Sequence, residues 1–475
     1  MNINQDKTMS YIHFSNYQLE ENTEYFIYIG ELKNYGLNVF LKEALSRIYG
    51  RNIDFIAIVP DVFEQYNYDN LIVINPLIES FQCRYGSNVH CRVSAKEFMT
   101  AVSENRKVRS LIDRILKRQS SLFLYMYESL CEMTLDDIPG VSILGPDKQI
   151  ATKVNNKAFQ IKELNGIVPV IDFRICHGYA NLIQTTDSLW ETWPNGIFVT
   201  KEYSAAGINS IVALSSKDIQ EKFGNLDTTY VITRFVPHRH DPTVLAVAAG
   251  KDEIYIAGVA DQNIENGNRF TGSTFPTVLP PSTIFELEQQ TRKIGSWLAE
   301  QGYRGIFGCD FIVTEANDIL FLEINARKQG TTLEFCCMLE HSLPQRAPNL
   351  TELEFYAVTE SLFPLNTVEM TWSSKNLHWG TFNYKIHQTV KTQGYLPQNV
   401  GEREAFKKIA TGNLKKDFLI LEHAGADFVV AQGAFIARVV ALGHDHDSVA
   451  QGIYQGCRTI ELTFAKEPIM EKEHV

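Results

Sequence analysis

The chain has 475 residues, 44% of them hydrophobic, and a formal net charge of -12 at pH 7. This length can bury several domain cores at roughly 100–200 residues each, while the acidic balance gives no general attraction for nucleic acid or an anionic membrane. The eight cysteines lack CxxC spacing, no apolar run reaches the roughly 18 residues of a membrane span, and the amino terminus lacks a signal-peptide pattern. We therefore expect a cytoplasmic protein with reduced thiols and without a zinc site.

The first part of the chain alternates strand-like and helix-like patterns. Residues 25–32 form an apolar run typical of a buried strand, and apolar residues then recur with helical spacing from Leu37 to Ile48, before Gly50. Two short apolar runs follow, at residues 54–60 and 70–76. This alternation predicts a small, mostly parallel α/β unit over residues 20–145. Because no GxGxxG follows its first strand, we do not predict a dinucleotide site there.

The next segment carries two lysines of interest. One helix face is predicted before Gly166, formed by Val154, Ala158, Ile161 and Leu164. Lys153 and Lys157 both flank this face, and the spacing to Gly166 favours Lys157. Residues 196–214 then predict a strand carrying Lys201, a loop of small residues containing Gly207, and a second strand from Ile208. Small residues let backbone N–H groups approach phosphate oxygens, although an ordinary hairpin would also explain this loop.

Further strands and one helix are predicted between residues 228 and 302. Residues 228–240 form a β run, and residues 243–262 form a hairpin around Gly250, followed by an irregular stretch that contains Arg269. We interpret the HRHD sequence at residues 238–241 as side chains that are solvated or that make ribose or structural hydrogen bonds, rather than as a metal site. Thr283 and Glu286 have capping-box spacing at the start of a helix that ends near Gly302.

Residues 303–332 carry the most informative pattern. A turn at Ala316 and Asn317 folds one strand back on the next, which places Asp310 opposite Glu323, and strand alternation puts Asn325 on the same side as Glu323. Two carboxylates and an amide oxygen suit a hard cation such as Mg²⁺. Arg327 follows on that face, where a guanidinium can stabilise a transferring phosphoryl group. The opposite, apolar face is predicted to hold Phe311, Val313, Leu322 and Ile324. The alternative is an exposed hairpin that merely carries charges.

These residues closely resemble the metal-binding hairpin of the ATP-grasp superfamily, an acidic residue on one strand and Glu-x-Asn-x-Arg on the next. The resemblance implies that Mg²⁺, or alternatively Mn²⁺, is held by Asp310, Glu323 and Asn325, and that Arg327 acts catalytically on an acylphosphate. It implies that Lys157, Lys201 and the Gly207 loop bind the phosphates of ATP. It also implies that the backbone of Arg234, Phe235 and Val236 binds adenine, although Thr233 and Arg234 stand where many members carry Glu. Arg269 could then meet a substrate carboxylate or phosphate, with a plain surface loop as the alternative.

The last part of the chain, residues 345–475, has aromatic and β-branched runs and ends in a strand, helix and strand over residues 433–464, with Asp447 or Ser448 capping the helix. It resembles the carboxy-terminal segment of biotin-carboxylase-like and peptide-ligase-like ATP-grasp chains. We predict an α/β (α+β) protein with the ATP-grasp fold. Its expected units are a Rossmann-like amino-terminal domain (20–145), an ATP-grasp domain (146–344, with lobes at 150–235 and 236–344) and a β-rich closing domain (345–475).

The resemblance implies an ATP-dependent ligase that converts a carboxylate to an acylphosphate and joins it to an amine, with release of ADP and phosphate. Amino acids or short peptides are the leading substrates, because nothing in the chain suggests a biotin carrier. A biotin-carboxylase-like, bicarbonate-activating enzyme and a catalytically silent ATP-binding regulatory protein are the alternatives. The expected partners are small molecules, not nucleic acid or membrane, and the oligomeric state is left open, with a homodimer among the possible assemblies.

Overall fold

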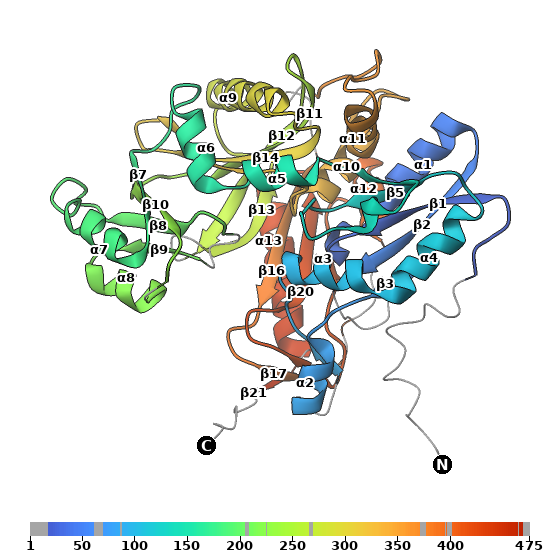
Figure 1. The fold of residues 1–475 in the computed structure, drawn as a ribbon, viewed down its shortest axis with the longest axis horizontal. Coiled ribbons are helices and arrows are strands. Elements are labelled where there is room, and N and C mark those ends of the chain that lie inside the picture. Colours follow the sequence, from blue (N-terminus) through green and yellow to red (C-terminus); the bar gives the residue numbers. More distant parts are fainter. Residues whose placement is uncertain are drawn as a thin grey trace.

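The computed structural model describes residues 18–468 except 61–69, 86–87, 205–208, 225, 266–268, 371–376, 395, 397–400 and 464; the side chains of residues 85 and 465–468 are also left out. Figure 1 shows a central antiparallel sheet with a parallel sheet on one side of it and a smaller sheet on the other. Within the described part, no helix is both long enough and apolar enough to cross a membrane. All eight cysteines are free thiols.

The amino-terminal sheet is parallel throughout, as predicted, with strand order β3-β2-β1-β5-β6. Its elements, together with the neighbouring β4, are β1 Thr23–Ile29, α1 Leu37–Tyr49, β2 Asn52–Val59, β3 Leu71–Val73, α2 Ile78–Tyr85, β4 Asn88–His90, α3 Ala95–Glu104, α4 Arg106–Leu116, β5 Leu122–Met126 and β6 Val141–Leu144. Helix α1 ends at Gly50, whose φ of 63° is the left-handed conformation that glycine adopts without strain. The strand order reverses between β1 and β5, which is where open α/β sheets bind ligands, at the carboxyl ends of the strands.

The smaller sheet has four antiparallel strands in the order β7-β10-β8-β9. The elements of this region are α5 Lys148–Val154, α6 Lys157–Leu164, β7 Phe173–His177, α7 Tyr179–Asp187, β8 Ile197–Lys201, β9 Ser210–Ala213, α8 Ser216–Phe223 and β10 Thr229–Arg234. The single helix face predicted before Gly166 was wrong, because the chain forms two helices. Asn156 caps the second one with its side chain, so Val154 belongs to the first.

The central sheet has eight strands in the order β15-β14-β11-β12-β13-β16-β20-β18. The elements from its first half are β11 Pro242–Gly250, β12 Glu253–Glu265, β13 Arg269–Phe275, α9 Pro281–Glu300, β14 Gly305–Val313, β15 Ile319–Asn325, α10 Thr332–Ser342 and α11 Leu350–Thr359. The capping box predicted at Thr283 and Glu286 was wrong, because α9 already begins at Pro281 and both residues lie inside it.

The last part of the chain completes the central sheet and adds a small mixed sheet with the order β21-β17-β19-β4. Its elements are β16 His378–Lys385, β17 Val390–Gln393, α12 Glu402–Ala410, β18 Asp417–Leu421, β19 Phe428–Val430, β20 Phe435–Gly443, α13 His446–Thr463 and β21 Ala465–Pro468. The predicted first strand and helix of the end are present as β20 and α13, but the second strand predicted before residue 464 was wrong, because α13 continues to Thr463 and β21 begins only at Ala465. Asp445, rather than Asp447 or Ser448, accepts the hydrogen bond at the start of α13, from the Ser448 N–H at 2.7 Å.

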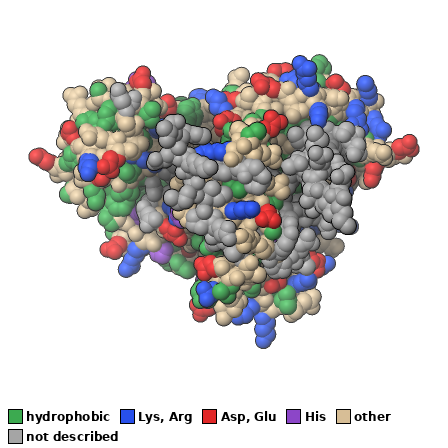
Figure 2. Space-filling view, turned by 90° about the horizontal axis from the view of Figure 1, so that it is seen from below, with side chains coloured by type: hydrophobic (Ala, Val, Ile, Leu, Met, Phe, Trp, Pro, Cys, Tyr) green, Lys and Arg blue, Asp and Glu red, His purple; other side chains and the backbone are tan. Residues whose placement is uncertain are grey.

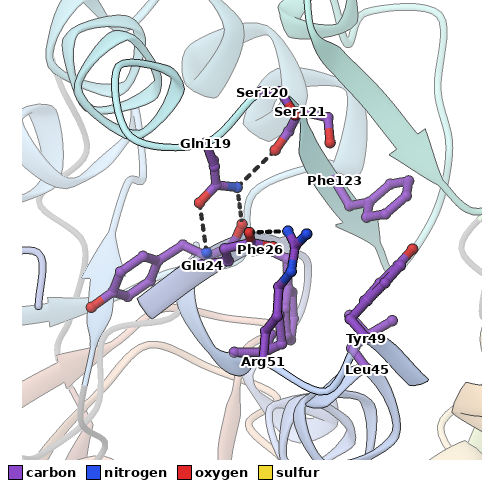
Figure 3. Close-up of a pocket in the computed structure, with 11 residues that line it drawn as sticks. Glu24, Phe26, Leu45, Tyr49, Arg51, Gln119, Ser120, Ser121 and Phe123 are labelled. Atoms are coloured by element: carbon purple, nitrogen blue, oxygen red, sulfur yellow. Dashed lines mark hydrogen bonds and ion pairs between the residues drawn. The ribbon is translucent and has the colours of Figure 1, made fainter. Parts of the chain in front are cut away.

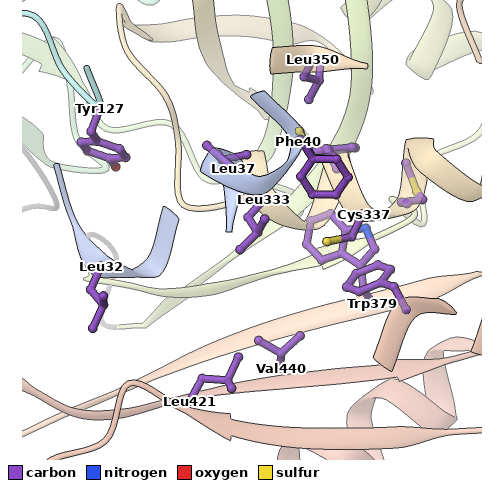
Figure 4. Packing of buried hydrophobic residues seen from close by; sticks show 14 of the residues in the cluster. Leu32, Leu37, Phe40, Tyr127, Leu333, Cys337, Leu350, Trp379, Leu421 and Val440 are labelled. Carbon is purple, nitrogen blue, oxygen red and sulfur yellow. The ribbon is translucent and has the colours of Figure 1, made fainter. Parts of the chain in front are cut away.

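One hydrophobic core joins elements that are far apart in sequence. Leu37 of α1, Leu333 of α10, Trp379 of β16 and Val440 of β20 belong to the same buried cluster (Figure 4). The rings of Phe275 and Trp379 stack with their centres 5.5 Å apart, which fastens β13 to β16. The three-unit division remains a prediction, and both this core and the central sheet cross its boundary at residue 345.

Candidate active site

The predicted hairpin is present, with Asp310 on β14 paired to Glu323 on β15. Asn317 has a φ of 65° in the turn between these strands. The register between the strands shifts after Asp310, because Asp310 pairs with Glu323 and Phe311 pairs with Phe321. Leu322 is thus an extra residue of β15 with no partner on β14, a β-bulge, and its side chain is 40% exposed. Placing Leu322 on the buried face was therefore wrong, whereas Phe311, Val313 and Ile324 are buried as predicted.

Three predicted site residues form a chain of hydrogen bonds at the open end of this hairpin. The Asn325 Nδ2 donates to Asp310 Oδ2 at 2.9 Å, and Arg327 Nη2 donates to Asn325 Oδ1 at 3.1 Å. The other carboxylate oxygen of Asp310 accepts from Thr243 Oγ1 at 2.7 Å, across the pair of strands β11 and β14. Asp310, Asn325 and Arg327 are thus held in fixed positions relative to one another.

Lys157 lies directly at this hairpin. Its Nζ contacts the Glu323 carboxylate, and its side chain is only 15% exposed. Gln160 holds the arrangement, because its amide bonds both the N–H and the carbonyl of Ile324, at 2.8 and 2.9 Å. Lys153, the competing candidate, instead donates to Gln301 Oε1 at 2.9 Å and is exposed. The structure therefore brings Lys157, and not Lys153, to the predicted metal ligands.

The smaller sheet brings the other predicted nucleotide residues toward Lys157. The N–H of Lys157 donates to the carbonyl of Glu202 at 2.8 Å, and the Asn156 side chain donates to the Glu202 carboxylate at 2.8 Å. Since Lys201 precedes Glu202 at the end of β8, both predicted phosphate lysines come from adjoining segments. Gly207 lies outside the described residues.

The predicted adenine segment follows β10. The N–H groups of Arg234 and Phe235 donate to the carbonyls of Asp172 and Gly196, each at 3.0 Å, whereas the N–H of Val236 has no partner among the described residues. The Val236 carbonyl accepts from His238 Nδ1 at 2.7 Å, and His238 Nε2 lies 2.8 Å from Asp241. Two residues of the HRHD sequence, His238 and Asp241, therefore make structural hydrogen bonds, as one of the interpretations of this sequence expected.

The amino-terminal sheet supplies residues that sequence reasoning missed. Arg327 Nη1 donates to the hydroxyl of Tyr127 at 3.1 Å, and Arg327 Nε lies 3.9 Å from a carboxylate oxygen of Glu128. Both residues directly follow β5, and Glu31 follows β1, the adjacent strand. The sequence offered one signal for these residues, because ligands of open α/β sheets bind at the carboxyl ends of the parallel strands. This rule indicates which edge of the sheet faces the site, but it does not indicate which residues there contact Arg327.

Electrostatics at the site follow from burial and from these contacts. Burial raises the pKa of Asp310, against its hydrogen bonds with Thr243 and its neighbours, and burial also raises the pKa of Glu128 against the charge of Arg327. Burial lowers the pKa of Lys157 to about 8, against the charge of Asp310. Because Lys157 also contacts the Glu323 carboxylate, which favours the ammonium form, we take it as charged at neutral pH.

The donor set at the hairpin fits a hard divalent cation. It offers two carboxylates, of which Glu323 is 27% exposed, and the Oδ1 of Asn325, which keeps a second lone pair beside its bond with Arg327. Mg²⁺ usually takes one or two carboxylates and completes its octahedron with phosphate oxygens and water. Among the described residues, no group of three or more His, Cys, Asp or Glu side chains is placed to hold a metal ion, so this hairpin supplies only two carboxylates and one amide oxygen.

A separate hollow of about 200 Å³ lies at the opposite end of the parallel sheet. It is lined by residues at or just before the start of β1, β2 and β5, among them Glu24, Arg51 and Gln119 (Figure 3). These are the amino ends of the strands, whereas Glu31 and Tyr127 follow the carboxyl ends. The hollow is therefore not part of the candidate active site.

The antiparallel smaller sheet, the central sheet with its acidic hairpin, and the parallel amino-terminal sheet together define the ATP-grasp fold. A family model described as the ATP-grasp domain matches residues 155–331, which contain every predicted site residue. The protein therefore has the ATP-grasp fold, and its residues 155–331 are similar to the ATP-grasp domain.

Known proteins with related sequences or structures agree with this class. The chain is 22% identical over 204 residues to the [butirosin acyl-carrier protein]–L-glutamate ligase of Niallia circulans, a match that spans 41% of this chain and about half of that relative, 48%. A biotin carboxylase from Campylobacter jejuni superposes with a TM-score of 0.62 at 14% identity, over 94% of this chain and 92% of that one. A carboxyaminoimidazole ribonucleotide synthase from Aspergillus clavatus, complexed with ATP, superposes with a TM-score of 0.58 at 13% identity, over 93% of this chain and 99% of that one. These structural likenesses concern the fold alone.

Proposed function

We propose that the protein is an ATP-dependent ligase that activates a carboxylate as an acylphosphate and joins it to an amine, releasing ADP and phosphate. The observation that carries this proposal is the hydrogen-bonded chain from Asp310 through Asn325 to Arg327, with Glu323 and Lys157 in contact beside it. This set lies where the smaller sheet, the central sheet and the amino-terminal sheet meet. Phosphoryl transfer needs mainly positioning and neutralisation of charge, which such a set can supply.

Each group has a definite part in the proposal. ATP binds between the smaller sheet and the central sheet, with adenine accepting a hydrogen bond from the N–H of Val236, for which the described part of the chain offers no partner. Lys157 and Lys201 neutralise phosphate oxygens. Asp310, Glu323 and Asn325 hold a divalent ion, Mg²⁺ or alternatively Mn²⁺, which would neutralise further phosphate charge. Arg327, held by Tyr127 and Asn325, donates hydrogen bonds to the acylphosphate and to the oxyanion formed when the amine attacks.

Amino acids or short peptides are the proposed substrates, and the cytoplasm the proposed location. The name of the Niallia circulans relative adds an acyl-carrier protein to the acceptors worth testing. A biotin-carboxylase-like activity and a catalytically silent ATP-binding protein are the alternatives. The intact set of two carboxylates, Asn325 and Arg327 favours turnover over silent binding, since a regulatory protein would not require it.

The test is ADP formation scanned over pairs of acids and amines, with the product identified by mass spectrometry. The proposal expects ADP only when both an acid and an amine are present, together with a product whose mass is their sum minus water. ADP formation with bicarbonate and a biotinylated acceptor would instead favour the carboxylase. ATP binding without ADP from any pair, with acyl-carrier protein included among the acceptors, would favour the silent binder.

A further inference from the structure

Basic side chains gather beside the candidate active site, toward the carboxy-terminal strands. Four of them form what we name the basic cluster, which is defined by Lys385 and the three cations whose charges act on it: Lys33, Arg92 and Arg269. The chain as a whole has a net charge of -12, so such a gathering does not follow from its composition. In Figure 2, basic and acidic side chains lie together in the middle of the face that is shown.

Two members of the basic cluster lie at the ends of adjacent strands. Strands β13 and β16 pair in the central sheet, with Arg269 at the start of one and Lys385 at the end of the other. Lys385 Nζ donates to the carbonyl of Phe270 at 3.1 Å, and Arg269 Nη1 lies 2.9 Å from His387 Nε2. The two cations thus face the same region from neighbouring strands.

A third member ties the cluster to the active site. Lys33 Nζ lies 5.5 Å from the centre of the Tyr127 ring, and the guanidinium of Arg327 lies 5.7 Å from the same ring. A Cβ placed on Gly330 would be 3.6 Å from Lys33 Nζ, which sets Lys33 against the segment that follows Arg327. Lys33 therefore lies beside the position proposed for the acylphosphate, and its charge also acts on Lys385.

The cluster has fewer carboxylates than cations. Glu31 pairs with Lys33 at 2.6 Å and Glu265 lies 3.7 Å from Arg269, but Lys385 has no carboxylate within ion-pair distance in the described part of the chain. Burial, together with the charges of Arg92, Arg269 and Lys33, lowers the pKa of Lys385 to about 8. A half-buried cation with cationic neighbours and no counter-ion is stabilised by an anionic ligand.

We propose that the basic cluster binds a second anionic group, a carboxylate or a phosphate, carried by one of the two substrates that are joined at the site, with Lys385 and Arg269 as its direct contacts. The proposal rests on the ligase function proposed above and names the substrate class. Arg and Lys donate charge-assisted hydrogen bonds to either anion. A neutral polar group in the same place would leave Lys385 without a counter-ion.

The test compares substrates that differ only in this charge. ADP formation is measured with L-glutamate against L-glutamine for a carboxylate, and with O-phospho-L-serine against L-serine for a phosphate. Each is offered both as the acid and as the amine. We expect the wild type to prefer the anionic substrate of one pair over its neutral counterpart. Lys385→Met should lower kcat/KM for that anionic substrate about 10- to 100-fold, the loss expected for a charged hydrogen bond. The kcat/KM for the neutral substrate of the same pair should not change.

Two further variants make this result specific. Lys385→Arg keeps the charge and should retain the preference. Lys391→Met removes a lysine from β17 that is 42% exposed and lies 3.6 Å from Asp427, outside the cluster, and should behave as the wild type. Equal use of anionic and neutral members by the wild type would overturn the proposal, and so would an equal loss for both members in Lys385→Met.

A binding measurement separates this proposal from the ligase function itself. Glutarate, butyrate and inorganic phosphate are titrated by calorimetry into wild type and Lys385→Met without ATP. We expect glutarate or phosphate to bind the wild type more tightly than butyrate does, and the difference to vanish in the variant. Anion binding without ADP formation would support the cluster and overturn the ligase, whereas ADP formation with no preference for an anion in either assay would overturn the cluster alone.

Discussion

Lys328 and Glu354 form a buried ion pair next to the candidate active-site residue Arg327, and a double-mutant cycle can test this pair. Lys328 is 1% exposed and Glu354 is fully buried, with Nζ 2.7 Å from the carboxylate. Lys328 Nζ also donates to the carbonyl of Met126 at 2.6 Å, at the end of β5. The pair therefore fastens the residue after Arg327 to the amino-terminal sheet.

Removing one partner should cost much more than removing both. Lys328→Met leaves a buried carboxylate without its cation, and Glu354→Gln leaves a buried ammonium without its anion; loss of one partner of a buried pair costs about 3–5 kcal/mol. In the double variant neither charge remains, so we expect most of that loss to be recovered. The predicted coupling energy is thus several kcal/mol, far beyond the roughly 0–1 kcal/mol of an exposed pair.

The assay is urea-induced unfolding followed by tryptophan fluorescence for the wild type, both single variants and the double variant. Lys217→Met serves as the control, because Lys217 is 80% exposed and lies 3.6 Å from Glu221 in a surface pair. It should change the unfolding free energy by less than about 0.5 kcal/mol. Additive effects of the two buried substitutions, or a loss under about 1 kcal/mol for each, would refute the reasoning.

Three other predictions concern the site, the packing and the response to pH. Lys157→Met should lower kcat/KM for ATP by about 100-fold or more while Lys153→Met changes it less than about threefold in the same ADP assay, and the reverse order would exclude our choice of lysine. Gly272→Ala should lower stability by about 1–3 kcal/mol, because its Cβ would lie 1.9 Å from a backbone carbonyl of β16, whereas Gly401→Ala, with open space, should be neutral in thermal unfolding. Burial raises the pKa of Glu334 from its ordinary 4.5 to about 8, so between these two pH values the folded state keeps a proton that the unfolded chain loses, and stability falls as pH rises from about 4.5 to about 8. Glu334→Gln should therefore flatten the decline of the thermal midpoint between about pH 5 and 8 by several degrees, at about 2–4 °C per kcal/mol, and an unchanged slope would show that this carboxyl is ionised in the fold.

The acidic hairpin could be predicted from the sequence because its geometry is local. Strand alternation and equal distances from one turn suffice to place Asp310 opposite Glu323, and the structure confirms this pairing. The same reasoning failed for Leu322, because alternation assumes a regular ladder and the extra residue of the bulge breaks it. The predicted start of α9 was also wrong, because the helix begins at Pro281, two residues before the predicted cap at Thr283.

The parts of the site that come from other units could not be predicted. Tyr127 and Glu128 contact Arg327 across about 200 residues of chain, and Lys328 donates to the carbonyl of Met126 across 202 residues. Such contacts depend on how whole sheets dock, which no local pattern records. The basic cluster has the same origin, and only Arg269 of its four members was noticed in the sequence.

The most direct test of the central claim is the binding of Mn²⁺ in the presence of ADP, measured by electron paramagnetic resonance. Glu323→Gln removes a charge and little volume, and we expect it to weaken Mn²⁺ binding at least about tenfold while the protein stays folded. Glu315→Gln makes the same change at the exposed turn of the same hairpin and should bind as the wild type does. Equal binding of Mn²⁺ by the Glu323 variant and the wild type would contradict the account.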